Sequence, residues 1–178
     1  MKNNKMNLAE QLNRRIDKKE IDEICKISQI DSSIIESLFN ILNSSNLRIA
    51  ENAAWILTHI KKETLLPFET KRRELEKLAI NTTSTTLKRL ILSILTRLQY
   101  SQNNIDANFV DFCLGMITNK NTTPGIAALC IKLAYNQSRF FEPLNDELLT
   151  LLSIMPDDLK PAVASARKNI LKKIKATS

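Results

Sequence analysis

The chain has 178 residues, of which 43% are hydrophobic and 25% charged, and its formal net charge is +7. It contains only 2 glycines, which argues against glycine-rich phosphate loops and against sheets joined by tight turns, because both need backbone at positive φ. A chain of this length can bury one hydrophobic core without disulfides or metal. We therefore expect one all-α domain, with helices joined by short polar loops.

Residues 1–30 are predicted to form a short N-terminal helical cap. Apolar residues recur there at helical spacing in two short runs surrounded by charged side chains. The runs are Leu8, Leu12 and Ile16, then Ile21, Ile24, Cys25 and Ile27. The start of the chain has no apolar run long enough for a signal peptide or a membrane span, so we expect neither.

Four helical hairpins are expected after the cap, over residues 31–62, 67–99, 105–138 and 145–175. The first begins at Asp31-Ser32-Ser33, residue types that favour helix N-caps. Pro67 and Pro124 mark later helix starts, because proline is tolerated in a first helical turn. Met155-Pro156 separates the two helices of the last hairpin, the second of which is expected from about Asp157.

The second helix of each hairpin repeats in sequence. Equivalent apolar positions recur after 38, 36 and 40 residues, at Leu57, Leu95, Ile131 and Leu171. A second set of equivalent positions is Ala53, Ile91, Ala127 and Arg167. The arginine in the fourth copy departs from the apolar pattern, as expected of a terminal capping repeat whose outer face meets water.

Helical hairpins of this length, with small residues in each second helix, resemble HEAT and armadillo-like α-solenoids. The resemblance covers roughly residues 31–175 and is most specific at the stretch RIAENAAWIL, which begins at Arg48. It implies a right-handed α-α superhelix of about four helical hairpins plus the N-terminal cap. Members of this superfamily are mostly scaffolds that bind protein or nucleic acid, and a minority of bacterial members resemble alkyl-base DNA glycosylases.

The residues that could hold a metal ion or a cofactor are few. His59 is the only histidine, and Cys25, Cys113 and Cys130 are far apart with no CxxC motif. We therefore expect no metal and no cofactor, and we expect reduced, buried thiols in a cytoplasmic protein. Trp55 is interpreted as a packing anchor, and the alternative is contact with a nucleotide on the inner surface, as in a glycosylase-like solenoid. His59 is interpreted as a polar residue at the edge of a buried stripe.

Basic residues concentrate in two regions. Residues 61–100 carry 9 basic and 4 acidic groups, and residues 161–178 carry 5 basic groups and no acidic one. In solenoids of the resembled family the second helices line the concave surface, which predicts a basic ladder there. Its residues are Lys88, Arg89, Arg97, Lys132, Lys172 and Lys173. Such a ladder could meet phosphates along a duplex, and the alternative is a solvated face that keeps the protein soluble.

The leading functional prediction is a non-enzymatic scaffold that binds a protein or peptide partner on its concave surface. No nucleophile elbow, Walker loop or carboxylate pair suggests catalysis. The alternative is a nucleic-acid (DNA backbone) binding solenoid related to the HEAT-like DNA glycosylases.

Overall fold

The computed structural model describes residues 8–177. The first seven residues of the expected cap, and Ser178, lie outside the described residues. The chain divides into two compact units, Met1–Leu98 (unit 1) and Gln99–Ser178 (unit 2). Every regular element across residues 8–177 is an α-helix or a 3-10 helix, so the all-α prediction is confirmed.

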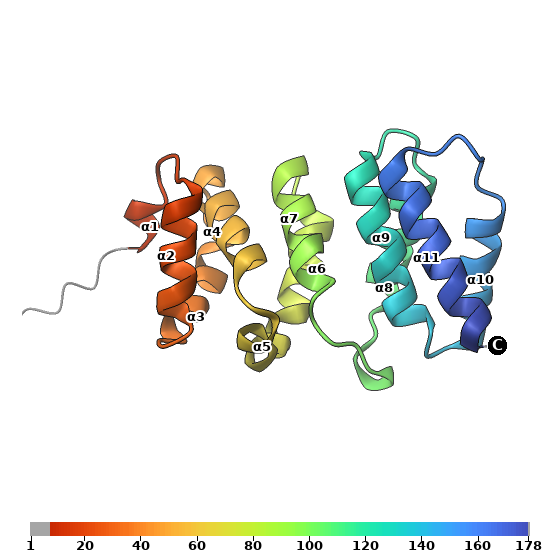
Figure 1. Cartoon of the computed structure of the whole chain (residues 1–178), viewed down its shortest axis with the longest axis horizontal. Coiled ribbons are helices and arrows are strands. Elements are labelled where there is room, and N and C mark those ends of the chain that lie inside the picture. Colours follow the sequence, from red (N-terminus) through yellow and green to blue (C-terminus); the bar gives the residue numbers. More distant parts are fainter. Residues whose placement is uncertain (1–7, 178) are drawn as a thin grey trace, which may run out of the picture. The chain divides into compact units, whose positions relative to one another are not determined.

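Unit 1 pairs its helices in chain order (Figure 1). Its elements are α1 (Leu8–Gln11), α2 (Lys18–Ser28), α3 (Ser33–Ile41), α4 (Leu47–His59), α5 (Lys62–Leu65), the 3-10 helix η1 (Leu66–Lys71), α6 (Arg72–Asn81) and α7 (Thr85–Leu95). Helix α3 packs on α4 and α6 packs on α7, which gives the two predicted hairpins. The second helices α4 and α7 also pack on each other, and α2 covers α3 and α4.

Side-chain caps begin the helices of unit 1. Asp17, Asn46 and Ser84 each accept a hydrogen bond from a backbone N–H in the first turn of α2, α4 and α7, respectively. At α3 the predicted cap acts through Asp31, whose Oδ1 accepts from the backbone N–H of Ser33 at 2.9 Å. These bonds satisfy donors that have no partner inside the helix.

Pro67 does not begin the long helix that the sequence indicated. It lies in the first turn of η1, and α6 begins only at Arg72. Phe68 adopts non-helical φ and ψ values of −98° and 15°. Its ring stacks on Phe39 of α3, with 5.5 Å between centroids. This contact holds the segment against the preceding hairpin, so the chain turns there before α6 can start.

The repeated stretch forms the centre of unit 1. Ala53, Ile56 and Leu57 of α4 are fully buried, as are the equivalent Ile91 and Leu95. These residues are buried in two helices that pack on each other, α4 and α7, so they form part of the close-packed interior of unit 1.

Unit 2 contains the two remaining hairpins. Its elements are η2 (Gln102–Asn104), α8 (Ala107–Thr118), α9 (Pro124–Ser138), α10 (Glu142–Ser153) and α11 (Pro161–Thr177). Helix α8 packs on α9 and α10 on α11, while α9 also packs on α10 and α11. Pro124 is the first residue of α9, as predicted. Helix α11 begins at Pro161, later than expected, because Lys160 precedes a proline and is disfavoured from helical backbone.

The three cysteines carry thiols rather than a disulfide. Cys113 and Cys130 are buried in unit 2, as expected, whereas Cys25 is half-buried. Its thiol lies 3.9 Å from the carbonyl oxygen of Ile56, to which it donates. Burial is the main reason why the pKa of the Cys25 thiol is raised.

Candidate binding grooves

Arg97 lies just beyond α7 and is bound to the preceding hairpin. Its guanidinium donates hydrogen bonds to the carbonyl oxygens of Leu57 at 3.1 Å, Thr58 at 2.8 Å, and Ile60. These carbonyls end α4, where a helix has acceptors with no internal partner and a partial negative charge. Burial lowers the pKa of this guanidinium. Arg97 therefore caps α4.

The other ladder residues are distributed between the two units. Lys88 and Arg89 lie on α7, where Arg89 is exposed. In unit 2, Lys132 is exposed on α9, and the Lys173 ammonium of α11 lies 5.7 Å from the ring centroid of Tyr135. Tyr135 lies one turn after Lys132 on α9. Lys132 and Lys173 are therefore carried by two helices that pack on each other, α9 and α11. The ladder as a whole spans both units and stays a prediction.

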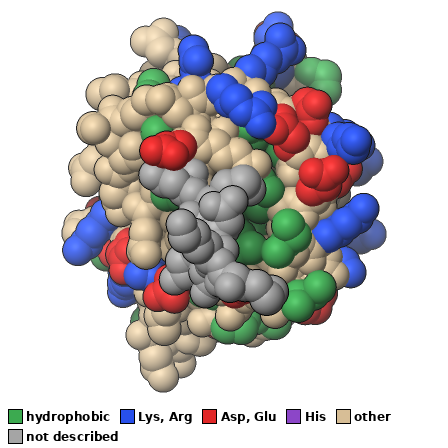
Figure 2. Space-filling view, turned by 90° about the vertical axis from the view of Figure 1, so that its left-hand side faces the viewer, with side chains coloured by type: hydrophobic (Ala, Val, Ile, Leu, Met, Phe, Trp, Pro, Cys, Tyr) green, Lys and Arg blue, Asp and Glu red, His purple; other side chains and the backbone are tan. Residues whose placement is uncertain are grey.

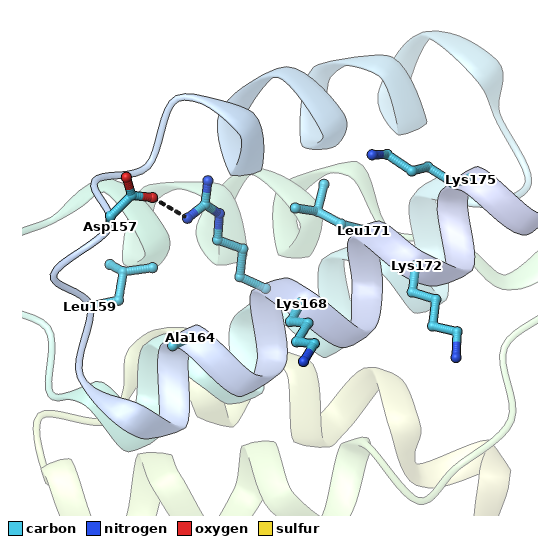
Figure 3. A pocket seen from close by; sticks show the side chains of 8 residues that line it. Asp157, Leu159, Ala164, Lys168, Leu171, Lys172 and Lys175 are labelled. Carbon is cyan, nitrogen blue, oxygen red and sulfur yellow. Dashed lines mark ion pairs between the residues drawn. The ribbon is translucent and has the colours of Figure 1, made fainter.

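A groove runs along α11 in unit 2, with a volume of about 440 Å³ (Figure 3). We call it the α11 groove; it is lined by Asp157, Leu159, Ala164, Arg167, Lys168, Leu171, Lys172 and Lys175. Leu159, Ala164 and Leu171 are half-buried and form its apolar floor. Lys168 and Lys172 extend from one side of α11, and Lys175 lies on the other.

Charge in the α11 groove is predominantly positive. Arg167 is already engaged, because its Nε donates to the carbonyl oxygen of Leu152 at 2.7 Å and its guanidinium lies 3.6 Å from Asp157. Lys168, Lys172 and Lys175 remain exposed. The groove therefore presents three lysines around an aliphatic floor.

The repeat alignment explains why this groove is open. Leu171 is equivalent to Leu57 of α4 and Ile131 of α9, and Lys168 is equivalent to Ala54 and Ala128. These four equivalents are buried, and α4 and α9 each pack on the next second helix of their unit. On α11 the same positions line an open groove, and Lys168 stands where the three earlier copies have the buried Ala54, Leu92 and Ala128.

A second groove lies in unit 1, between the turn before α2 and the exposed side of α4, with a volume of about 600 Å³. We call it the α4 groove; it is lined by Arg14, Arg15, Ile16, Asp17, Lys18, Arg48, Asn52 and Trp55. The α4 residues among these are spaced by four and three positions, so they share one face of the helix. Asn52 fixes the opposite wall, since its amide donates to the carbonyl oxygens of Leu12 at 2.9 Å and Arg14 at 2.8 Å.

The charged residues of the α4 groove have different roles. Arg14 forms an ion pair with Glu20, and the hydrogen bond from Arg14 is the main reason why the pKa of the Glu20 carboxyl is lowered. Asp17 is occupied as the N-cap of α2. Arg15, Lys18 and Arg48 are exposed. The groove thus keeps three outward cations beside one half-buried indole.

Trp55 and His59 lie one turn apart on α4, and their side chains contact each other. Their rings meet edge to face with 6.1 Å between centroids, and His59 Nδ1 lies 3.0 Å from the Trp55 carbonyl oxygen. His59 is exposed at the last position of α4. Trp55 is half-buried and lines the α4 groove, unlike the fully buried Ala54 and Ile56 beside it.

The predicted basic ladder includes one lining residue of the α11 groove, Lys172, and none of the α4 groove. Lys168 could have been found, because a lysine at a position held by alanine in two earlier repeats is a signal of an uncovered face. Arg15 and Lys18 could not, because only the folded chain places them opposite α4.

Charge is mixed or internally paired at two other places. The end of unit 1 shown in Figure 2 has Lys and Arg side chains interspersed with Asp and Glu, next to exposed hydrophobic side chains. On α6, the buried Glu76 lies 3.9 Å from Arg72 and 3.6 Å from Arg73.

Within residues 8–177 no group of His, Cys, Asp and Glu side chains is arranged to hold a metal ion. None of the described helices combines the length and apolar character that crossing a membrane requires.

A family model described as a HEAT repeat domain matches residues 8–174. No curated protein and no solved structure matches the chain.

Proposed function

Since the chain belongs to the HEAT repeat family, we propose that it is a non-enzymatic helical-repeat scaffold whose α11 groove binds an acidic amphipathic helix of a partner protein. One observation carries this proposal. Positions that are buried in the earlier second helices line an open groove on α11, with an aliphatic floor and three exposed lysines. A partner helix would occupy the place that a following helix takes in the earlier hairpins.

The chemistry of the groove selects the occupant. Leu159 and Leu171 offer apolar contact to leucine-type side chains at helical spacing, the usual anchors of helix-in-groove binding. Lys168, Lys172 and Lys175 would attract carboxylates at the rim, which favours acidic partners and speeds association more than it adds affinity. The wider prediction of a partner on the concave surface stays a prediction.

Fluorescence anisotropy with synthetic helices tests the proposal. The probe is a labelled peptide with leucines at helical spacing flanked by glutamates, and its counterpart replaces the glutamates by lysines. We expect the full chain to bind the glutamate peptide and not the lysine peptide. Lys168→Glu should weaken binding about tenfold, which corresponds to about 1.4 kcal/mol.

Lys120→Glu is the matched control, because it makes the same charge change at an exposed position of unit 2 outside the groove. Leu171→Gln should weaken binding without any change in charge. Equal losses from Lys168→Glu and Lys120→Glu would mean unspecific charge attraction and would refute the groove as the site.

A further inference from the structure

The α4 groove differs in chemistry from the α11 groove, and we infer that it binds single-stranded nucleic acid, with a base stacked on Trp55 and phosphates held by Arg15, Lys18 and Arg48. This site lies in unit 1 and does not depend on the proposed function of the α11 groove. Its evidence is the combination of one half-buried indole and three outward cations around a space of about 600 Å³.

The contents of the groove favour a nucleotide over a peptide. Its aliphatic residue, Ile16, is buried, so it offers little surface to a leucine-type anchor. The other uncharged apolar side chain in the lining is the half-buried Trp55, and a flat aromatic face is a platform on which any base can stack. The α11 groove has the opposite character, with aliphatic residues on its floor and no aromatic side chain in its lining.

The cations are suited to phosphate. Arg15 and Arg48 carry planar guanidinium groups, which bind phosphate oxygens through two parallel N–H bonds, and Lys18 adds a point charge. The two walls are also held in place before any ligand arrives. Asn52 bonds the turn to α4, and Asn46 at the start of α4 donates to Asn13 Oδ1 at 2.8 Å. A ligand therefore meets a preformed groove rather than two mobile segments.

Trp55 makes the inference directly measurable, because it is the only tryptophan of the chain. Titration of the full chain with a twelve-nucleotide oligothymidylate should quench Trp55 fluorescence, since a base stacked on the indole reduces its emission. Three phosphate contacts predict that the binding constant falls with salt at a log–log slope of about −2. Polyglutamate of equal length and inorganic tripolyphosphate should leave the emission unchanged.

Substitutions separate the groove from general charge attraction. With a labelled oligothymidylate followed by anisotropy, Arg48→Ala should weaken binding about fivefold or more and make the salt slope less negative by about 0.7. Trp55→Phe should weaken it less than Trp55→Leu, because phenylalanine still stacks. Lys77→Ala, which removes one charge from an exposed position of α6 in the same unit, is the control outside the groove and the ladder and should change little.

Three results would overturn the inference. They are an absence of quenching at low salt, equal losses from Arg48→Ala and Lys77→Ala, or equally strong binding of polyglutamate, which would make the α4 groove a site for acidic protein. Lys168→Glu in the α11 groove should not affect the oligothymidylate, so the two grooves can fail independently.

Discussion

Replacing Arg97 by alanine tests whether this residue is structural. The guanidinium bonds three carbonyl groups at the end of α4, two of them at 3.1 and 2.8 Å. A hydrogen bond from a charged donor contributes about 1.5–3 kcal/mol when buried. Arg97 is only half-buried, so water can replace part of each bond, and we take about 1 kcal/mol for each. Arg97→Ala should therefore lower the free energy of unfolding by about 2–3 kcal/mol.

Urea unfolding followed by Trp55 fluorescence is the appropriate assay, because Trp55 and Arg97 belong to the same unit. With a slope of about 1.5 kcal/mol per molar urea, the midpoint should fall by about 1.3–2 M at unchanged slope. Arg97→Lys should lose roughly half as much, since an ammonium keeps the charge but not the fork of donors. Arg89→Ala is the exposed control and should stay within about 0.5 kcal/mol of the parent. If Arg97→Ala were as mild as Arg89→Ala, Arg97 would not cap α4.

Three further predictions concern Cys25, Glu20 and Gln137. Burial raises the Cys25 pKa above its ordinary value of 9.0, so the folded state holds the thiol proton more tightly than the unfolded state. The resulting stability is present below about pH 9 and is lost as the pH rises through the folded-state pKa. Cys25→Ala should therefore reduce the loss of unfolding free energy that urea unfolding measures between pH 8 and pH 10. Arg14→Ala should raise the lowered pKa of the Glu20 carboxyl toward its ordinary value, as an NMR titration would show, and an unchanged titration would refute the pairing. The fully buried Gln137 accepts from the Asp106 N–H at 2.9 Å, so Gln137→Ala should cost about 1–3 kcal/mol in thermal unfolding, and a loss below about 0.5 kcal/mol would contradict this role.

The fold could be predicted because the apolar residues that each helix buries recur at helical spacing in the sequence. The positions of Leu57, Leu95 and Ile131 were expected to be buried from their spacing alone, and all three are. The predicted helix starts agree with the structure at one proline and not at the other, since Pro124 begins α9 whereas Pro67 does not begin α6. That difference arises from the contact of Phe68 with Phe39. Phe39 belongs to another hairpin, so this contact has no counterpart in the sequence around Pro67.

The candidate grooves were less predictable, because they depend on where side chains of different hairpins meet. Arg97 was expected on an open ladder, yet its acceptors lie 37 to 40 residues earlier in the chain. The sequence shows that Arg97 is charged, but it does not show which groups the guanidinium contacts. Lys172 was predicted as a ladder residue from the repeat alignment, and its binding role stays a prediction. Arg15 belongs to a turn whose position is fixed by a hydrogen bond from Asn52 of α4, which the sequence does not show.

Helix α4 is bonded at several points to elements on either side of it in sequence. Asn52 holds the turn before α2, and Glu51 accepts a hydrogen bond at 2.7 Å from Ser84, the N-cap of α7. Arg97, beyond the other end of α7, bonds the last turn of α4. Both ends of α7 are thus fastened to one helix, which makes the coupling between neighbouring repeats strong. In a linear array such coupling suppresses the opening of one repeat alone. The amide hydrogens of α4 and α7 should consequently exchange with solvent together, in one cooperative event.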